Sequence, residues 1–174
     1  MKLLVTGPPG VGKTTLIKNL CSELKDCVGF YTEEIRGEGG KRVGFDIVSL
    51  DGQLRSPLAR VNTSVKGPKV GQYTVMTHDF EVTSLKCLGK EKLQNSKVIV
   101  IDEIGKMESF SNKFQSLVRQ IFQLEDKIIL ATIPVKHENL NLVKEIVNRG
   151  DTEIIEVTKA NRDDLKDVML TRFN

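Results

Sequence analysis

The chain has 174 residues, a formal net charge of +3, and contents of 39% hydrophobic and 28% charged residues. These values are typical of a single globular domain that buries its own core, and so small a positive charge does not favour a nucleic-acid or anionic-membrane partner. No apolar run approaches the roughly 20 residues of a membrane span, and the first residues do not resemble a secretion signal, so we expect a cytoplasmic protein with no membrane partner.

The first predicted elements flank a glycine-rich loop. Residues 3–6 form a short apolar strand, and residues 13–24 form a helix with leucines on one face. Between them the sequence reads Gly7-Pro8-Pro9-Gly10-Val11-Gly12-Lys13-Thr14-Thr15, which is the Walker A, or P-loop, pattern. In such a loop, backbone N–H groups surround phosphate, the lysine reaches the β- and γ-phosphates, and the hydroxyl after it coordinates Mg²⁺. The loop therefore predicts a nucleoside-triphosphate site.

A block rich in β-structure is predicted next, over residues 28–76. Extended runs at 28–36, 43–50, 53–61 and 70–76 are separated by turn-forming residues such as Asp51-Gly52 and Lys66-Gly67-Pro68. We interpret this block as antiparallel hairpins inserted after the first helix.

From residue 79 onward, predicted helices and strands alternate. The helices cover residues 79–93, 111–124, 138–148 and 160–173, and the strands cover 98–101, 128–131 and 154–157. This alternation predicts an α/β fold with a mostly parallel sheet and helices on both faces. We expect one P-loop domain, residues 1–174, that carries the insertion at about 28–76.

An acidic pair, Asp102 and Glu103, directly follows the apolar run 98–101. Doubly wound folds bind their ligands at the carboxyl ends of such strands. As a Walker B element, Asp102 would hold Mg²⁺ and Glu103 would orient or deprotonate the attacking water. The same two residues also fit a solvated turn at the end of a strand.

Residues 102–105 also match the Asp-x-x-Gly pattern of GTP-binding switches. Those proteins recognise guanine with an Asn/Thr-Lys-x-Asp motif, and the nearest stretch, Thr158-Lys159-Ala160-Asn161, ends in Asn. An amide cannot replace the charge-assisted pair that a carboxylate makes with guanine. Strict guanine specificity is therefore not expected.

Four further residues are candidates for contacts at the site. Thr132 follows the run 128–131 and either contacts the γ-phosphate or the water, or satisfies the backbone at the end of its strand. Lys106 and Arg149 are candidates to neutralise charge in the transition state, and Arg162 to lie against the base or ribose. Most residues of these last types lie on protein surfaces without such a role.

Several stretches resemble the THEP1 family of cytoplasmic nucleoside-triphosphatases, known in animals as cancer-related nucleoside-triphosphatases. The most specific are Gly29-Phe30-Tyr31-Thr32-Glu33-Glu34 and Asp102-Glu103-Ile104-Gly105-Lys106-Met107-Glu108, and the resemblance covers nearly the whole chain. It implies a RecA-like P-loop fold with an antiparallel β insertion, and slow, Mg²⁺-dependent hydrolysis of several nucleoside triphosphates to diphosphate and phosphate. It also implies nucleotide contacts along residues 7–14 and at Val100, Ile101, Asp102, Glu103, Ile104, Gly105, Lys106 and Met107.

We therefore predict a nucleoside-triphosphatase that acts on ATP, GTP, CTP and UTP. Lys13, Glu103 and Thr132 are the predicted catalytic residues, and Thr14 and Asp102 are the predicted Mg²⁺ ligands.

Two alternatives stay open. A nucleotide or nucleoside kinase would need an acceptor pocket and a lid with several arginines, whereas Arg36, Arg42, Arg55 and Arg60 are dispersed. A nucleotide-gated binding module for a protein or RNA would use the insertion with its aromatic residues Phe30, Tyr31, Phe45 and Tyr73, although aromatic residues at strand spacing are more often core.

Overall fold

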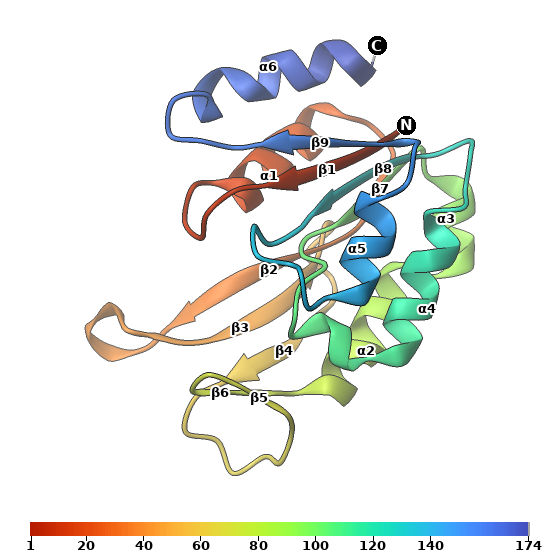
Figure 1. Cartoon of the computed structure of the whole chain (residues 1–174). Coiled ribbons are helices and arrows are strands. Elements are labelled where there is room, and N and C mark those ends of the chain that lie inside the picture. The colour runs from red at the N-terminus through yellow and green to blue at the C-terminus, as the bar shows by residue number, and fades with distance from the viewer. Residues whose placement is uncertain (174) are drawn as a thin grey trace.

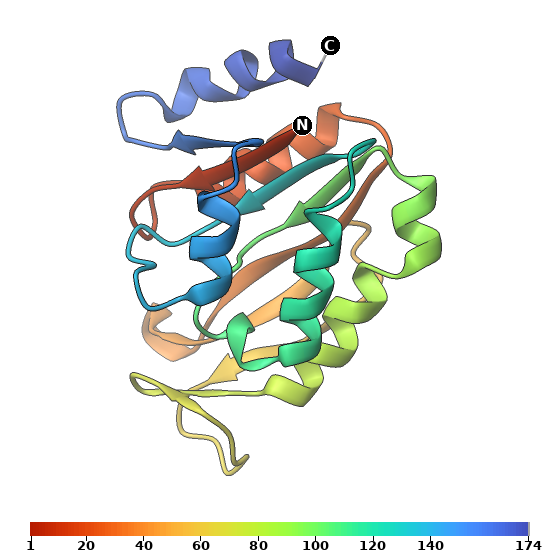
Figure 2. The same ribbon diagram turned by 45° about the vertical axis from the view of Figure 1, so that its right-hand side comes forward.

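One nine-stranded mixed sheet runs through the whole molecule, and helices cover both of its faces (Figures 1 and 2). The structure, a computed structural model, describes residues 1–173. The strand order is β5-β6-β4-β3-β2-β7-β8-β1-β9. The predicted α/β class, with a sheet covered on both sides, is confirmed.

Five neighbouring strands at one end of this order are parallel to one another. They are β2 (Cys27–Arg36), β7 (Val98–Ile101), β8 (Ile128–Thr132), β1 (Lys2–Thr6) and β9 (Thr152–Glu156). All four residues of β7 are buried, as a continuous β-branched run with both faces covered requires. Because these strands are parallel, their carboxyl ends meet at one edge, where the phosphate loop and the acidic pair come together.

The other half of the sheet is antiparallel and extends the same sheet outward. It consists of β3 (Arg42–Ser49), β4 (Arg55–Arg60), β5 (Lys69–Val70) and β6 (Tyr73–Val75). The strand predicted at 70–76 is instead a small hairpin, because Gly71 adopts a positive φ of 56° and turns the chain. β2 pairs in parallel with β7 and antiparallel with β3, so it joins the two halves.

The helices divide between the two faces. α1 (Lys13–Glu23) and α6 (Arg162–Phe173) cover one face, and α2 (Thr77–Cys87), α3 (Lys90–Asn95), α4 (Asn112–Ile121) and α5 (Asn141–Val147) lie on the other (Figures 1 and 2). Two short 3₁₀ turns, η1 (Glu38–Gly40) and η2 (Glu108–Phe110), complete the elements. None of the described helices combines the length and apolarity needed to cross a membrane.

One predicted helix proved to be two. The run 79–93 is interrupted after α2, where Gly89 is extended with ψ 148° and its carbonyl starts α3. Glycine weakens a helix interior, so the break falls where the propensity is lowest. The helix predicted at 138–148 begins only at Asn141, and the residues before it form part of a loop at the site.

The aromatic residues of the β-rich block have different environments. Phe30 is fully buried and packs against Phe80 and Phe114, with ring centroids 6.0 Å from each. Phe45 packs on Tyr73 at 5.3 Å and also lines the cleft described below. Phe30 therefore belongs to the hydrophobic core and cannot contact a protein or RNA partner.

Candidate active site

The loop between β1 and α1 is shaped by three glycines with positive φ. Gly7, Gly10 and Gly12 have φ values of 150°, 77° and 115°. A Cβ on Gly7 would also lie 2.6 Å from the carbonyl oxygen of Val157, so the loop packs tightly against the chain after β9. Only glycine adopts these conformations without strain, and the result is a backbone concavity at the N-terminus of α1.

Lys13, the first residue of α1, folds back over this loop. Its Nζ donates to the carbonyl oxygens of Gly7 at 2.6 Å and Pro8 at 3.3 Å. The ammonium group is therefore held at the mouth of the concavity. A phosphate bound there would be faced by backbone N–H groups and by this positive charge.

The two predicted motifs meet at Asp102, which follows β7 and is 1% exposed. Thr14 Oγ1 donates to Asp102 Oδ2 at 2.6 Å, and Thr132 Oγ1 donates to Oδ1. Burial raises the pKa of the Asp102 carboxyl, and the two hydroxyl donors and Lys13 oppose that rise. Residues of the predicted Walker A and Walker B elements are thus in direct contact.

Thr132, the predicted catalytic sensor, is fully buried at the end of β8, and its hydroxyl donates to Asp102. This contact supports a role in positioning the Asp102 carboxylate.

Glu103 lies beside Asp102 but lines the open cleft. Burial and, to a smaller extent, the Asp102 charge raise the pKa of Glu103 to about 7, while Lys13 opposes the rise. A carboxylate in this position can accept a proton from a group bound in the cleft.

Glu108 is a buried acid that our predictions did not assign. It is 5% exposed at the start of η2, and its Oε2 accepts from the Gly105 N–H at 3.1 Å. Burial first, and then the charges of Glu103 and Asp102, raise the pKa of Glu108 to about 8. The sequence could have indicated this contact, because Glu108 lies three residues after Gly105. A Glu at that distance can accept a hydrogen bond from the backbone N–H at the start of a turn.

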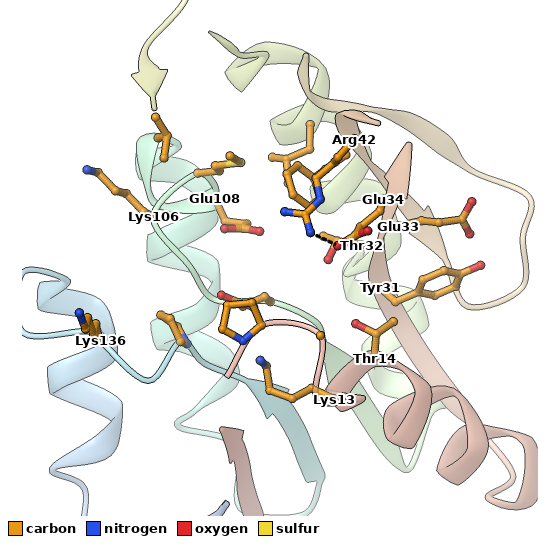
Figure 3. Close-up of a pocket in the computed structure, with 18 of the residues that line it drawn as sticks. Lys13, Thr14, Tyr31, Thr32, Glu33, Glu34, Arg42, Lys106, Glu108 and Lys136 are labelled. Atoms are coloured by element: carbon orange, nitrogen blue, oxygen red, sulfur yellow. Dashed lines mark ion pairs between the residues drawn. The ribbon is translucent and has the colours of Figure 1, made fainter. Parts of the chain in front are cut away.

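The cleft itself has a volume of about 860 Å³ and lies between two walls. One wall is the loop after β7 together with the loop after β8, including Lys106, Met107 and Lys136. The other is formed by β2, β3 and their neighbours, including Tyr31 and Arg42, with the phosphate loop at its floor (Figure 3). The structure thus adds the β-rich block, which the sequence left without a role, to the site.

Several predicted residues lie elsewhere. The side chains of Val100, Ile101 and Ile104 are fully buried in the core, so a nucleotide contact at these predicted positions would have to come from their backbone. Arg149 binds Asp151, which also pairs with Lys2 at the amino end of β1. That is the opposite edge of the sheet from the site, so Arg149 is not available to the transition state.

Arg162 and Asn161 occupy the loop after β9. Arg162 approaches the carbonyl oxygen of Val11 at 3.5 Å and lies beside the phosphate loop, outside the cleft lining. Asn161 is fully engaged within its own loop: Oδ1 accepts from Thr158 N–H at 2.8 Å, and Nδ2 donates to the Glu156 carbonyl at 2.9 Å. The Asn161 amide therefore bonds to the chain that precedes α6 and does not present its polar atoms to a base.

The contacts of Gly105 bear on the comparison with GTP-binding switches. The Gly105 N–H, which would contact the γ-phosphate in such a switch, is bound to Glu108.

The arginines of the β-rich block bear on the kinase alternative. All four form ion pairs with acids of the same block: Arg36 and Arg42 with Glu34, Arg55 with Asp46 and Glu33, and Arg60 with Asp46. The block therefore carries no cluster of free arginines within the described chain.

The buried Glu108 makes the stability of the protein depend on pH. Its pKa is about 8 in the folded chain and about 4.3 when unfolded, so between these values the unfolded state releases a proton that the folded state keeps. The contribution of the neutral Glu108 carboxyl to the free energy of unfolding is complete below the pKa that Glu108 has in the unfolded chain. This contribution falls as the pH rises to about 8.

We therefore expect Glu108→Gln to stabilise the protein increasingly between pH 5 and 8.5, by on the order of a few kcal/mol at the upper end. Urea unfolding of both proteins across this range measures the difference. An equal free-energy difference at every pH would contradict the buried neutral acid.

Comparisons with known proteins find related sequences over nearly the whole chain. The sequence profile of a family described as NTPase matches residues 2–170. Nucleoside-triphosphatase THEP1 of Thermotoga sp. (strain RQ2) is 46% identical, and the match covers 100% of this chain and 97% of the relative. The cancer-related nucleoside-triphosphatase of Homo sapiens is 47% identical, with 94% and 91% covered.

Two solved structures share the fold. The crystal structure of THEP1 from the hyperthermophile Aquifex aeolicus superposes with a TM-score of 0.87 at 38% identity, covering 98% of both chains. The solution structure of a human cancer-related nucleoside triphosphatase gives a TM-score of 0.84 at 45% identity, covering 99% of this chain and 97% of that one.

Proposed function

The chain belongs to the nucleoside-triphosphatase family that includes THEP1 and the cancer-related nucleoside-triphosphatases, and from this premise we propose that it hydrolyses several nucleoside triphosphates in the cleft described above, with Mg²⁺ as cofactor. The products are the nucleoside diphosphate and phosphate. We place this activity in the cytoplasm, in keeping with three cysteines that remain free in the described chain.

One observation carries the proposal: the hydroxyl of Thr14 and the carboxylate of Asp102, from the two nucleotide motifs, lie 2.6 Å apart. Hydroxyl and carboxylate oxygens are hard ligands, and Mg²⁺ usually takes one or two protein ligands and completes its shell with phosphate oxygens and waters. The described residues contain no group of three or more His, Cys, Asp or Glu residues that could hold a metal alone. The pair Thr14 and Asp102 thus fits an ion that arrives with its nucleotide.

The remaining residues have distinct tasks in this proposal. The loop N–H groups and Lys13 bind the phosphates, and Mg²⁺, when bound, supplies positive charge to the β- and γ-phosphate oxygens. Glu103 orients the attacking water and accepts its proton. Thr132 holds Asp102 in place through its buried hydroxyl.

Broad base specificity is supported by the loop after β9. Asn161 stands where a guanine-reading carboxylate would be, and its side chain is used within the loop. Arg162, the other candidate there, is half-exposed and can lie against any base or ribose without reading the base edge.

Phosphate release tests the proposal directly. We expect release from ATP, GTP, CTP and UTP at comparable rates with Mg²⁺, loss of release in EDTA, and recovery on adding back Mg²⁺. Release confined to one base would contradict the broad specificity. Phosphate release that persists in EDTA would contradict the proposed role of Thr14 and Asp102 as Mg²⁺ ligands.

A further inference from the structure

The cleft is larger than a triphosphate group requires. Ligand pockets of about 300–1,000 Å³ hold entire drug-sized molecules, and this cleft of about 860 Å³ lies at the upper end of that range. Its lining reaches from the phosphate loop to the antiparallel strands β3, β4 and β5, and Figure 3 shows Arg42 on that side. We call this part the outer pocket and define it by Glu34, Arg42, Phe45, Val70, Met107 and Glu108.

The outer pocket lies on the γ-phosphate side of the predicted nucleotide. Lys13 and Thr14 contact the β- and γ-phosphates in a P-loop, and both line the cleft together with Glu103. The base and ribose are expected near Arg162, on the other side of the loop. Among the described residues, none from β9 or α6 lines the cleft. The outer pocket is therefore not needed for the nucleoside part of the triphosphate.

The walls of the outer pocket combine flat apolar surface with polar groups. Phe45, whose ring packs on Tyr73, lines the cleft together with Val70 and Met107. Figure 3 shows the Glu108 carboxyl and the Arg42 guanidinium pointing toward one another from opposite walls. Glu108 is 95% buried by the protein, so a ligand that contacts it would be largely shielded from water. Such a pocket suits a flat ring system that carries hydroxyl groups.

The charges of the pocket disfavour a phosphorylated ligand. Arg42 is the one arginine in the lining from the described chain, and it pairs with Glu34 at 2.7 Å. Phosphate recognition normally uses arginines free to bind bidentately. Because Arg42 is already paired and the Glu108 opposite is a neutral acid, the six residues that define the outer pocket offer no unpaired positive charge, so the pocket fits an uncharged hydroxyl compound better than a nucleotide.

We propose that the outer pocket binds a nucleoside-like acceptor, to which the protein transfers the γ-phosphoryl group in place of water. The inference rests on the proposed function, because it uses the same bound triphosphate and the same Glu103. A bond forms between the acceptor hydroxyl oxygen and the γ-phosphorus, the bond from the γ-phosphorus to the bridging oxygen breaks, and the hydroxyl proton passes to Glu103. The products are a nucleoside diphosphate and a phosphorylated acceptor.

The test measures both fates of the phosphoryl group in one reaction. The protein is incubated with Mg²⁺, γ-labelled ATP and adenosine, guanosine, cytidine or uridine in turn, and labelled nucleoside monophosphate and labelled inorganic phosphate are separated. We expect at least one nucleoside to yield labelled monophosphate. We also expect that nucleoside to bind, by calorimetry, to protein already saturated with a non-hydrolysable ATP analogue.

Two arginines of the same ion-pair cluster provide a matched pair of variants. Arg42 and Arg36 bind the two oxygens of Glu34, but only Arg42 lines the cleft. Arg42→Ala is expected to lower the ratio of transferred to released phosphate about tenfold, the scale of one lost charge-assisted hydrogen bond. Arg36→Ala is expected to keep the ratio of the unmodified protein. Because the ratio is internal to each reaction, partial unfolding of a variant does not change it.

Three results would contradict the proposal of an acceptor pocket. The first is inorganic phosphate as the one labelled product with all four nucleosides, and the second is nucleoside binding that the ATP analogue abolishes. The third is an equal ratio of transferred to released phosphate in Arg42→Ala and Arg36→Ala. In each case continued phosphate release would leave the hydrolase proposal intact. Absence of both labelled products would instead count against the proposed function itself.

Discussion

Glu103→Gln is expected to lower the turnover number for ATP by about 10²–10⁴-fold, the usual contribution of a positioned general base. The amide has the size of the carboxylate and can still hold water by hydrogen bonds, but it does not accept a proton. Because Glu103 lines the cleft while Asp102, bonded to Thr14, is the proposed metal ligand, nucleotide affinity is expected to stay near that of the unmodified protein. Single-turnover phosphate release and fluorescent-nucleotide binding measure the two quantities.

Glu125→Gln serves as the control for this variant. Glu125 is exposed in the turn after α4, away from the cleft lining, so the same chemical change is expected to leave turnover and affinity unaltered. If Glu103→Gln retained full turnover, the water-handling role of Glu103 would be wrong. A loss of nucleotide affinity as large as the loss of turnover would indicate that Glu103 contributes to nucleotide binding and not to catalysis.

Lys13→Ala is expected to affect both binding and turnover. Lys13 Nζ is the positive charge at the mouth of the loop, where it bonds the Gly7 and Pro8 carbonyl oxygens. Its removal takes away the cation that we propose faces the β- and γ-phosphates, and losing one preorganised donor of this type lowers turnover by about 10²–10³-fold. We expect weaker nucleotide affinity in addition, because Lys13 faces the phosphates in the ground state too.

Lys25→Ala is the matched control, since Lys25 is exposed after the end of α1. We expect Lys13→Ala to remain folded, because the Lys13 side chain lies outside the apolar core, and circular dichroism and thermal melting check this. Wild-type affinity in a folded Lys13→Ala protein would contradict the assignment of the loop as the phosphate site.

Motifs whose chemistry is local could be located from the sequence. The glycines at 7, 10 and 12 are required by the positive φ that the loop adopts there, and Lys13 and Thr14 follow at fixed positions. The Asp102 and Glu103 pair follows a strand recognisable by its continuous apolar run. Since parallel strands end at one edge of their sheet, the predicted meeting of these two motifs followed from the order of the elements alone.

Other features depend on which segments pack together. Glu108 resembles a surface acid in the sequence, yet the loop after β7 buries it beside Glu103, and burial is what shifts its pKa. Thr132 was expected to face the substrate, but it is enclosed and bonds to Asp102. Arg149 lies at the opposite edge because the loop before β9 is at the amino end of that parallel strand.

The phosphate loop, the acidic pair and the alternation that makes an α/β sheet were predictable because each is specified by neighbouring residues. That the β-rich block continues the same sheet and forms a wall of the cleft became evident from the packing of the folded chain. The reason is the pairing of β2 with both β7 and β3. This pairing brings Arg42 and Phe45 to the same cleft as Glu108, more than 60 residues further along the chain, and no local pattern encodes a contact at that separation.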